Sequence, residues 1–148
     1  MAKRSLLYAG TFGIASLLCG VIFVDRFNPK KARATIDKVV NTIKTRKTKV
    51  WMYPEGTRSA GTDKSMLPFK KGAFHIAIKA QVPIIPVVIS NYKDCYDPRG
   101  HTFEQINVKV CVLPPIPTEG KTVDDVNQLT EDVWEVMLQT YNKISNNN

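Results

Sequence analysis

The spacing of apolar and polar positions predicts three amphipathic helices along the chain. Segment 32–43 repeats apolar side chains at helical spacing, and its other positions carry lysine and arginine. Segments 71–80 and 126–144 show the same periodicity, the last as a stripe long enough to cover one face of a sheet. Thr122 and Asp125 stand three residues apart before this final stripe, which predicts a capping box at its start.

Four further segments predict strands. The runs at 21–24 and 50–53 are short, apolar and rich in β-branched or aromatic residues, as buried strands are. Segment 82–89 is β-rich but contains two prolines, and segment 106–113 alternates apolar and polar residues, which predicts a half-exposed strand. Because strands and helical segments alternate, we expect one α/β domain over residues 1–148, with a layered, mostly parallel sheet flanked by helices.

The stretch 5–24 contains no charged residue. Its length just reaches that of a membrane span, but three glycines and several hydroxyl side chains dilute its apolar character. We therefore expect a helix over 6–18, packed in the core or lying at a membrane interface, followed by the strand at 21–24. A true membrane span is the alternative for this stretch.

Charge is unevenly distributed along the chain. The net charge is +8, and residues 1–50 hold 11 basic and 2 acidic side chains, whereas residues 119–148 hold 2 basic and 6 acidic ones. A basic first third favours anionic partners such as phosphate or an acidic membrane surface. The three cysteines are scattered without metal-ligand spacing, so we expect neither a disulfide framework nor a metal site. We also expect no bound cofactor.

Nucleic acid is an unsuitable partner for the most basic segment. Segment 30–49 holds eight basic residues, but it has no aromatic side chain on which a base could stack. Its apolar face is also needed for the core. We therefore expect no nucleic-acid binding.

Two predicted strands end in charged residues that suit an anionic ligand. Arg26 follows the strand at 21–24, and Arg58 follows the strand at 50–53. Ligands of parallel α/β sheets bind beyond the carboxyl ends of the strands, so the two guanidinium groups are expected to converge on one phosphate. The alternative is a solvated pair of loops in which Glu55 and Arg58 form only a local ion pair.

The loop after the second strand adds groups of matching chemistry. Gly56 permits a tight turn and a close approach of the backbone to a ligand, and Thr57 adds a hydroxyl donor. Cations near the start of the helix at 71–80 lie where backbone amides also favour anions. The residues expected to bind the substrate phosphate are Arg26, Glu55, Gly56, Thr57 and Arg58, supported by Asp25, Lys70, Lys71 and Gly72.

These segments resemble the sequence blocks of the glycerolipid acyltransferase family. Residues 53–59 are similar to its Phe-Pro-Glu-Gly-Thr-Arg-Ser block, with Tyr53 in place of the phenylalanine. Segments 20–26, 69–74 and 82–87 are similar to three other blocks, in the same order. Segments 2–7 and 113–118 are similar to the corresponding segments of the branch of this family that acylates 1-acyl-sn-glycerol 3-phosphate.

The resemblance implies transfer of an acyl group from acyl-CoA, as co-substrate, to the sn-2 hydroxyl of lysophosphatidic acid, giving phosphatidic acid. It also implies a location at the endoplasmic reticulum membrane, where this chain is expected to be peripheral or weakly anchored.

The family's general base lies in a His-x-x-x-x-Asp block, which this sequence does not contain. Five residues after His75 stands Ala80, and five residues after His101 stands Ile106. The resemblance therefore implies a domain incomplete on its N-terminal side, and we assign no catalytic residue. The chain is expected to be slow or inactive alone, with a full-length enzyme as a partner. The alternative is a non-catalytic, lipid- or CoA-binding remnant or regulatory isoform.

Overall fold

The computed structural model describes residues 2–3, 7–24, 29–57, 66–91, 96–97, 102–103, 105 and 107–145. Its helices are α1 (Gly10–Leu18), α2 (Pro29–Arg46), α3 (Gly72–Ala80), the short 3₁₀ helix η2 (Val123–Asp125) and α4 (Val126–Ser145). Its strands are β1 (Ala2–Lys3), β2 (Phe23–Val24), β3 (Val87–Ile89), β4 (Tyr96–Asp97), β5 (Thr102–Phe103) and β6 (Val110–Val112). The predicted helices at 32–43, 71–80 and 126–144 are thereby confirmed.

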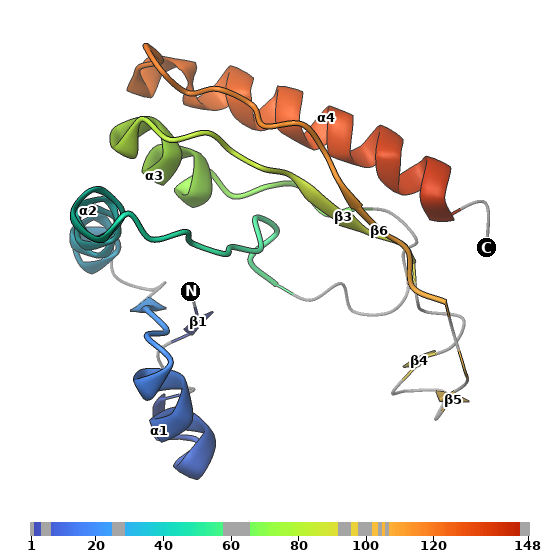
Figure 1. Cartoon of the computed structure of the whole chain (residues 1–148), viewed down its shortest axis with the longest axis horizontal. Helices are drawn as coiled ribbons and strands as arrows, with labels where there is room; N and C mark the ends of the chain where they lie inside the picture. Colours follow the sequence, from blue (N-terminus) through green and yellow to red (C-terminus); the bar gives the residue numbers. More distant parts are fainter. Residues whose placement is uncertain are drawn as a thin grey trace.

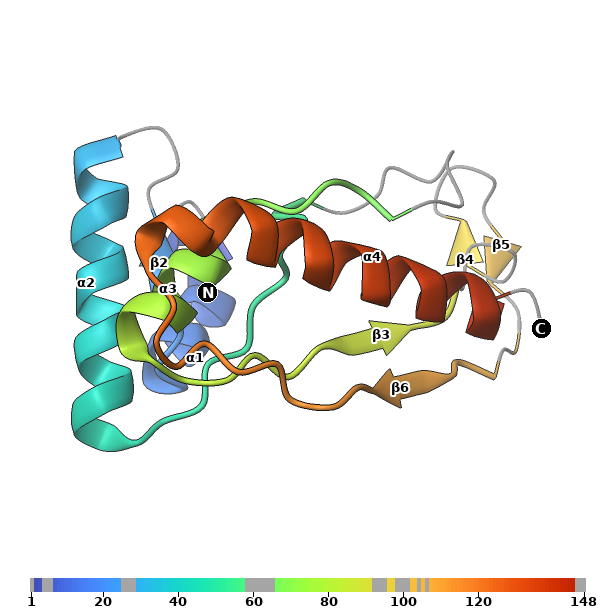
Figure 2. The same cartoon turned by 90° about the horizontal axis from the view of Figure 1, so that it is seen from above.

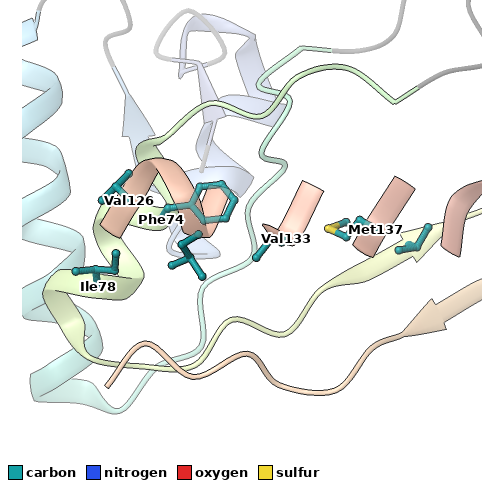
Figure 3. Packing of buried hydrophobic residues seen from close by; sticks show 7 residues of the cluster. Phe74, Ile78, Val126, Val133 and Met137 are labelled. Carbon is teal, nitrogen blue, oxygen red and sulfur yellow. The ribbon is translucent and has the colours of Figure 1, made fainter. Parts of the chain in front are cut away.

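The core lies where α4 packs on α3 and on the β3–β6 ladder (Figure 1). The apolar stripe of α4 meets Phe74 and Ile78 of α3 and Val88 of β3, as the close view shows for the two α3 residues (Figure 3). Phe74 and Val88 are almost fully buried. The buried members of this cluster are Phe74, Ile78, Val88, Val126, Leu129, Val133 and Met137. The periodic apolar positions of the sequence thus predict correctly which face of α4 is covered.

The start of the closing helix has the predicted capping box. The Thr122 backbone N–H donates to Asp125 Oδ2 at 2.6 Å, and the threonine side chain in turn accepts a hydrogen bond from the Asp125 backbone. The backbone hydrogen bond from Thr122, with a second one from the threonine hydroxyl, lowers the pKa of Asp125. The cap satisfies backbone donors that the first turn of a helix leaves without a partner.

The longest ladder has one covered face and one open face. Strand β3 pairs antiparallel with β6, and Val88 stands opposite Cys111 on the face that α4 covers. Val110 and Val112 point the other way and are 60% and 64% exposed. Strand β6 is therefore half-exposed as predicted, but its valines occupy the exposed face within the described part of the chain.

The expected, mostly parallel sheet is not what the described strands form. The β1–β2 pair is parallel, whereas β3–β6 and β4–β5 are antiparallel. Antiparallel strands need only a chain reversal, while parallel ones need a crossover of a dozen or more residues, usually through a helix. The structure has no helix between β3 and β6 in the described part of that connection, which is consistent with antiparallel pairing.

The prediction of a buried strand at 50–53 is wrong. The segment has no strand pairing, and the side chains of Trp51 and Tyr53 are 57% and 70% exposed. Their rings contact each other edge to face, with centroids 6.2 Å apart. A short apolar run forms a buried strand only when neighbouring strands pair with it and another layer covers it, and here both rings stay mostly exposed.

Helix α2 runs crosswise to α4 and packs against α3 (Figure 2). Helix α1 lies on the side of α2 away from α4 (Figure 1). Its large apolar side chains are turned outward, with Leu18 82% exposed and Phe12 60% exposed. In the described part of the chain no helix combines the length and the apolar character needed to cross a bilayer.

Thr118 provides a test of the packing between α3 and the chain that follows it. Its buried hydroxyl bridges the carbonyl oxygens of Ala77 and Val82, at 3.2 and 2.8 Å. Thr118→Val preserves shape but removes this donor, so we expect urea denaturation to show a loss of about 1–2 kcal/mol in the free energy of unfolding. Thr45→Val, at an exposed threonine that donates within α2, is the control and should change it by less than about 0.5 kcal/mol.

Candidate functional site

The predicted phosphate-binding loop begins as a tight turn. The Gly56 amide donates to the Tyr53 carbonyl at 3.1 Å, and Gly56 has a φ of +67°, a left-handed conformation that glycine adopts without steric cost. Thr57 follows with an exposed side chain. The expectation that Gly56 makes a tight turn is confirmed.

A second segment, 66–70, lies against this turn. The Lys70 amide donates to the Pro54 carbonyl at 2.8 Å, and the Leu67 amide donates to Glu55 Oε2 at 3.2 Å. Both hydrogen bonds join groups that are more than ten residues apart in the sequence. The carboxylate of Glu55 thus holds the turn to the segment that leads into α3.

Segment 66–70 is in turn attached to the core. The indole N–H of Trp134, on α4, donates to the Leu67 carbonyl at 3.2 Å. The ring of Phe69 stacks on Phe74 of α3, with centroids 6.3 Å apart. Met66 also packs against the buried cluster. The position of the candidate site is therefore set by α3 and α4, through residues that the sequence motifs do not assign to a phosphate site.

The cations Lys70 and Lys71 are neighbours in sequence but contact different parts of the structure. The side chain of Lys70 lies over Gly56, so a Cβ placed on that glycine would stand only 2.8 Å from Lys70 Cδ. Lys71 occupies the N-cap position of α3, where its side chain makes no capping hydrogen bond and its charge lowers the pKa of His75. Gly72 begins the helix, and a Cβ there would meet nothing within 4 Å.

His75 lies half-buried one helical turn beyond Lys71. Burial is the main cause that lowers the pKa of this imidazole, and the charges of Lys79 and Lys71 lower it further. A neutral imidazole is therefore favoured on this face of α3. No hydrogen bond within the described part of the chain links the His75 side chain to the turn at 53–56. We expect a packing role for this histidine.

The structure brings together part of the predicted site. Lys70 lies over Gly56, and Glu55 binds the amide of Leu67 in the same segment as Lys70. Asp25, Arg26 and Arg58 lie outside the described residues. The convergence of the two arginines on one phosphate stays a prediction. Leu67 and Trp134, which position the site, carry no sequence signal beyond membership of a loop and of an apolar stripe.

Comparison with known proteins places this turn in a family context. The model of the family described as Acyltransferase matches residues 1–90, which include both the 53–56 turn and segment 66–70. This match covers more than half of the chain. The chain belongs to the acyltransferase family. The resemblance expected from the four sequence blocks is thereby confirmed.

Individual relatives of the family are similar over almost the whole chain. The human 1-acyl-sn-glycerol-3-phosphate acyltransferase alpha is 48% identical over 98% of this chain and 50% of its own length. The 1-acyl-sn-glycerol-3-phosphate acyltransferase of Saccharomyces cerevisiae is 39% identical over 97% of this chain and 47% of its own. The chain thus spans about half the length of the curated relatives it matches.

A solved structure has a similar fold. The crystal structure of the 1-acyl-sn-glycerophosphate (LPA) acyltransferase PlsC from Thermotoga maritima matches with a TM-score of 0.69 and 26% sequence identity. The match covers 97% of this chain and 55% of that one. The expected acyltransferase-like α/β fold is confirmed at this level, without the parallel layered sheet.

The lowered pKa of His75 predicts how stability depends on pH. The unfolded chain binds a proton on this residue near pH 6.5, whereas the folded chain does so only at lower pH. The contribution of His75 to stability is therefore complete above pH 6.5 and is lost as the pH falls through 6.5 towards the folded value. Urea unfolding between about pH 5 and pH 8 should show this slope, and His75→Asn should reduce it. An NMR titration that gives His75 a pKa at or above 6.5 contradicts the prediction.

Proposed function

We propose that the chain serves acyl transfer from acyl-CoA to the sn-2 hydroxyl of lysophosphatidic acid, which yields phosphatidic acid, and that its part in the reaction is to bind the phosphate of the acceptor. The observation that carries this proposal is the Glu55-Gly56 turn with Lys70 laid across it, inside the segment matched by the acyltransferase family. The glycine leaves room for the lysine side chain to lie over the turn, and the lysine supplies positive charge.

The names of the relatives support the substrate class. Several are 1-acyl-sn-glycerol-3-phosphate acyltransferases, from mammals and yeast, and their similarity covers the whole candidate site. Their acyl acceptor, by name, combines a phosphate with an acyl chain. A site for it needs cations for the headgroup and access to a lipid surface, which fits the basic first third of this chain.

A second candidate function is a non-catalytic lipid- or CoA-binding protein, for which association with a full-length enzyme remains the expected mode of action. It is favoured by one sequence observation: neither histidine has an aspartate five positions later. A general base contributes typically about 10²- to 10⁴-fold to rate, so phosphate binding can persist where turnover is weak. The two candidates share the phosphate site and differ in turnover.

Membrane association forms part of the proposal. Lysophosphatidic acid and its product reside in bilayers, so the site must approach a lipid surface, which we place at the endoplasmic reticulum. Tyr8, Phe12 and Leu18 lie outward on and beside α1 and are mostly exposed. Such a short apolar helix suits contact with one leaflet, because roughly 20 residues are needed to cross a bilayer.

Acyl transfer by the purified chain tests the enzymatic candidate. With radiolabelled acyl-CoA and lysophosphatidic acid, we expect turnover at least about 10²-fold below that of a full-length relative, because no positioned general base is assigned. His75→Ala should leave this residual rate unchanged. Robust turnover that His75→Ala abolishes would contradict the packing role given to this histidine.

Flotation with liposomes tests the membrane part. We expect the chain to bind phosphatidylcholine vesicles containing phosphatidate more strongly than pure phosphatidylcholine vesicles, because of its basic first third. Leu18→Ser should weaken binding to both by about fivefold, since it removes apolar surface from α1. Val136→Ser, at an exposed valine on α4, is the matched control and should bind normally. Equal binding to both kinds of vesicle would contradict an electrostatic contribution to membrane binding.

A further inference from the structure

The contacts of Lys70 distinguish it from Lys71, its neighbour in the described part of the candidate site. A Cβ built on Gly56 would lie 2.8 Å from Cδ, 3.1 Å from Cε and 3.4 Å from Nζ of this lysine. The outer methylenes and the ammonium therefore lie directly over the glycine. Real Cβ atoms do not approach other atoms this closely, so any larger residue at position 56 would displace the lysine side chain.

The backbone fixes the same relation. The Lys70 amide donates to the Pro54 carbonyl, and three residues earlier the Leu67 amide donates to the Glu55 carboxylate. These two hydrogen bonds fix the backbone of segment 66–70 beside the turn, and the contact with Gly56 places the Lys70 side chain over it. The long side chain thus loses less freedom on binding an anion than an unconstrained surface lysine would.

The carboxylate of Glu55 has a structural use. It accepts the Leu67 amide, whose own carbonyl accepts the indole N–H of Trp134. A hydrogen bond from a backbone amide to a carboxylate is charge-assisted and therefore strong. Glu55 is thereby suited to hold segment 66–70 in place, rather than to contact an anionic headgroup that its charge would repel.

Resting on the proposed function, we propose that Lys70 donates to the phosphate monoester of the acyl acceptor and that Gly56 and Glu55 are positioning residues that act through it. A lysine ammonium is a compact charge with three donors, which suits a phosphate monoester. Lys71 lies at the N-cap of α3, where its charge lowers the pKa of His75. The two adjacent lysines therefore have different roles in the proposal.

The test measures binding of the whole chain to vesicles. Phosphatidylcholine vesicles carry either phosphatidate, a monoester, or phosphatidylglycerol, a diester, and only the preference for phosphatidate is scored. Lys70→Met keeps the methylene stem over Gly56 and removes the charge, and we expect it to reduce the preference about tenfold. Lys70→Arg should stay within about twofold. Lys38→Ala, on an exposed face of α2, removes an equal charge and should also keep the preference.

Soluble competitors distinguish the sources of phosphate. Glycerol 3-phosphate should displace the chain from phosphatidate vesicles, and Lys70→Met should weaken this displacement about tenfold. Displacement that Lys70→Met leaves unchanged overturns the proposal. Inorganic phosphate that competes as well as glycerol 3-phosphate overturns the assignment to a glycerolipid headgroup.

The positioning roles have their own test. Gly56→Ala should lower the preference as Lys70→Met does, but should add no further loss to Lys70→Ala, because its effect passes through the lysine. Gly120→Ala is the matched control: its φ is also positive, at +75°, but a Cβ there meets nothing within 4 Å. Losses that multiply in the double variant overturn the role of Gly56.

Glu55 is tested by a conservative pair that does not depend on backbone strain. Glu55→Gln retains an oxygen that can accept the Leu67 amide and should keep the preference, whereas Glu55→Ala should lose it. Equal losses in both variants would overturn the positioning role of Glu55. Urea unfolding of each variant confirms that it is folded before binding is compared.

The outcomes separate this inference from the proposed function. If the unmodified chain shows no preference for phosphatidate over phosphatidylglycerol, both fail. If the preference is present and Lys70→Met retains it while Arg58→Ala loses it, only the inference fails, because the headgroup is then bound by the arginine.

Discussion

The attachment of segment 66–70 to the core is the constraint on which the candidate site depends. Phe69 stacks on Phe74 of α3, and Trp134 of α4 donates to the Leu67 carbonyl, so the segment is held by α3 and α4. The segment in turn holds the turn at 53–56, because the Lys70 amide donates to the Pro54 carbonyl and the Leu67 amide donates to the Glu55 carboxylate. The packing of the core thereby determines where the charged side chain of Lys70 lies.

Apolar side chains lie both in the buried core and on exposed faces of this structure. Helix α4 covers one face of the β3–β6 ladder, while Val110 and Val112 lie open on the other, and α1 exposes its own apolar side chains on the side away from α4. Large, contiguous apolar patches are typical of surfaces that meet lipid or protein. The lipid acceptor that we propose would account for the exposed apolar side chains of α1.

Membership of the acyltransferase family and catalytic activity are separate matters in this chain. The match over residues 1–90 includes the turn suited to a phosphate, whereas the sequence contains no histidine followed by aspartate five positions later. Binding a charged headgroup depends on preorganised cations, and removal of a proton depends on a positioned base. We propose that Lys70, held beside the turn at Glu55 and Gly56, meets the first requirement, so headgroup binding can be measured without turnover.

Local spacing by itself determined the helices at 29–46, 72–80 and 126–145, the capping box at Thr122 and the tight turn at Gly56, because each depends on side chains within a few residues of one another. Only the tertiary structure decided that Trp51 and Tyr53 are exposed, that β3 and β6 run antiparallel, and that Lys70 rather than Lys71 lies on the turn. Those features depend on contacts such as Trp134 with Leu67, which are 67 positions apart. A periodic pattern predicts which residues share a face of a helix or strand. Whether that face is buried depends on the segment, often distant in sequence, that packs against it.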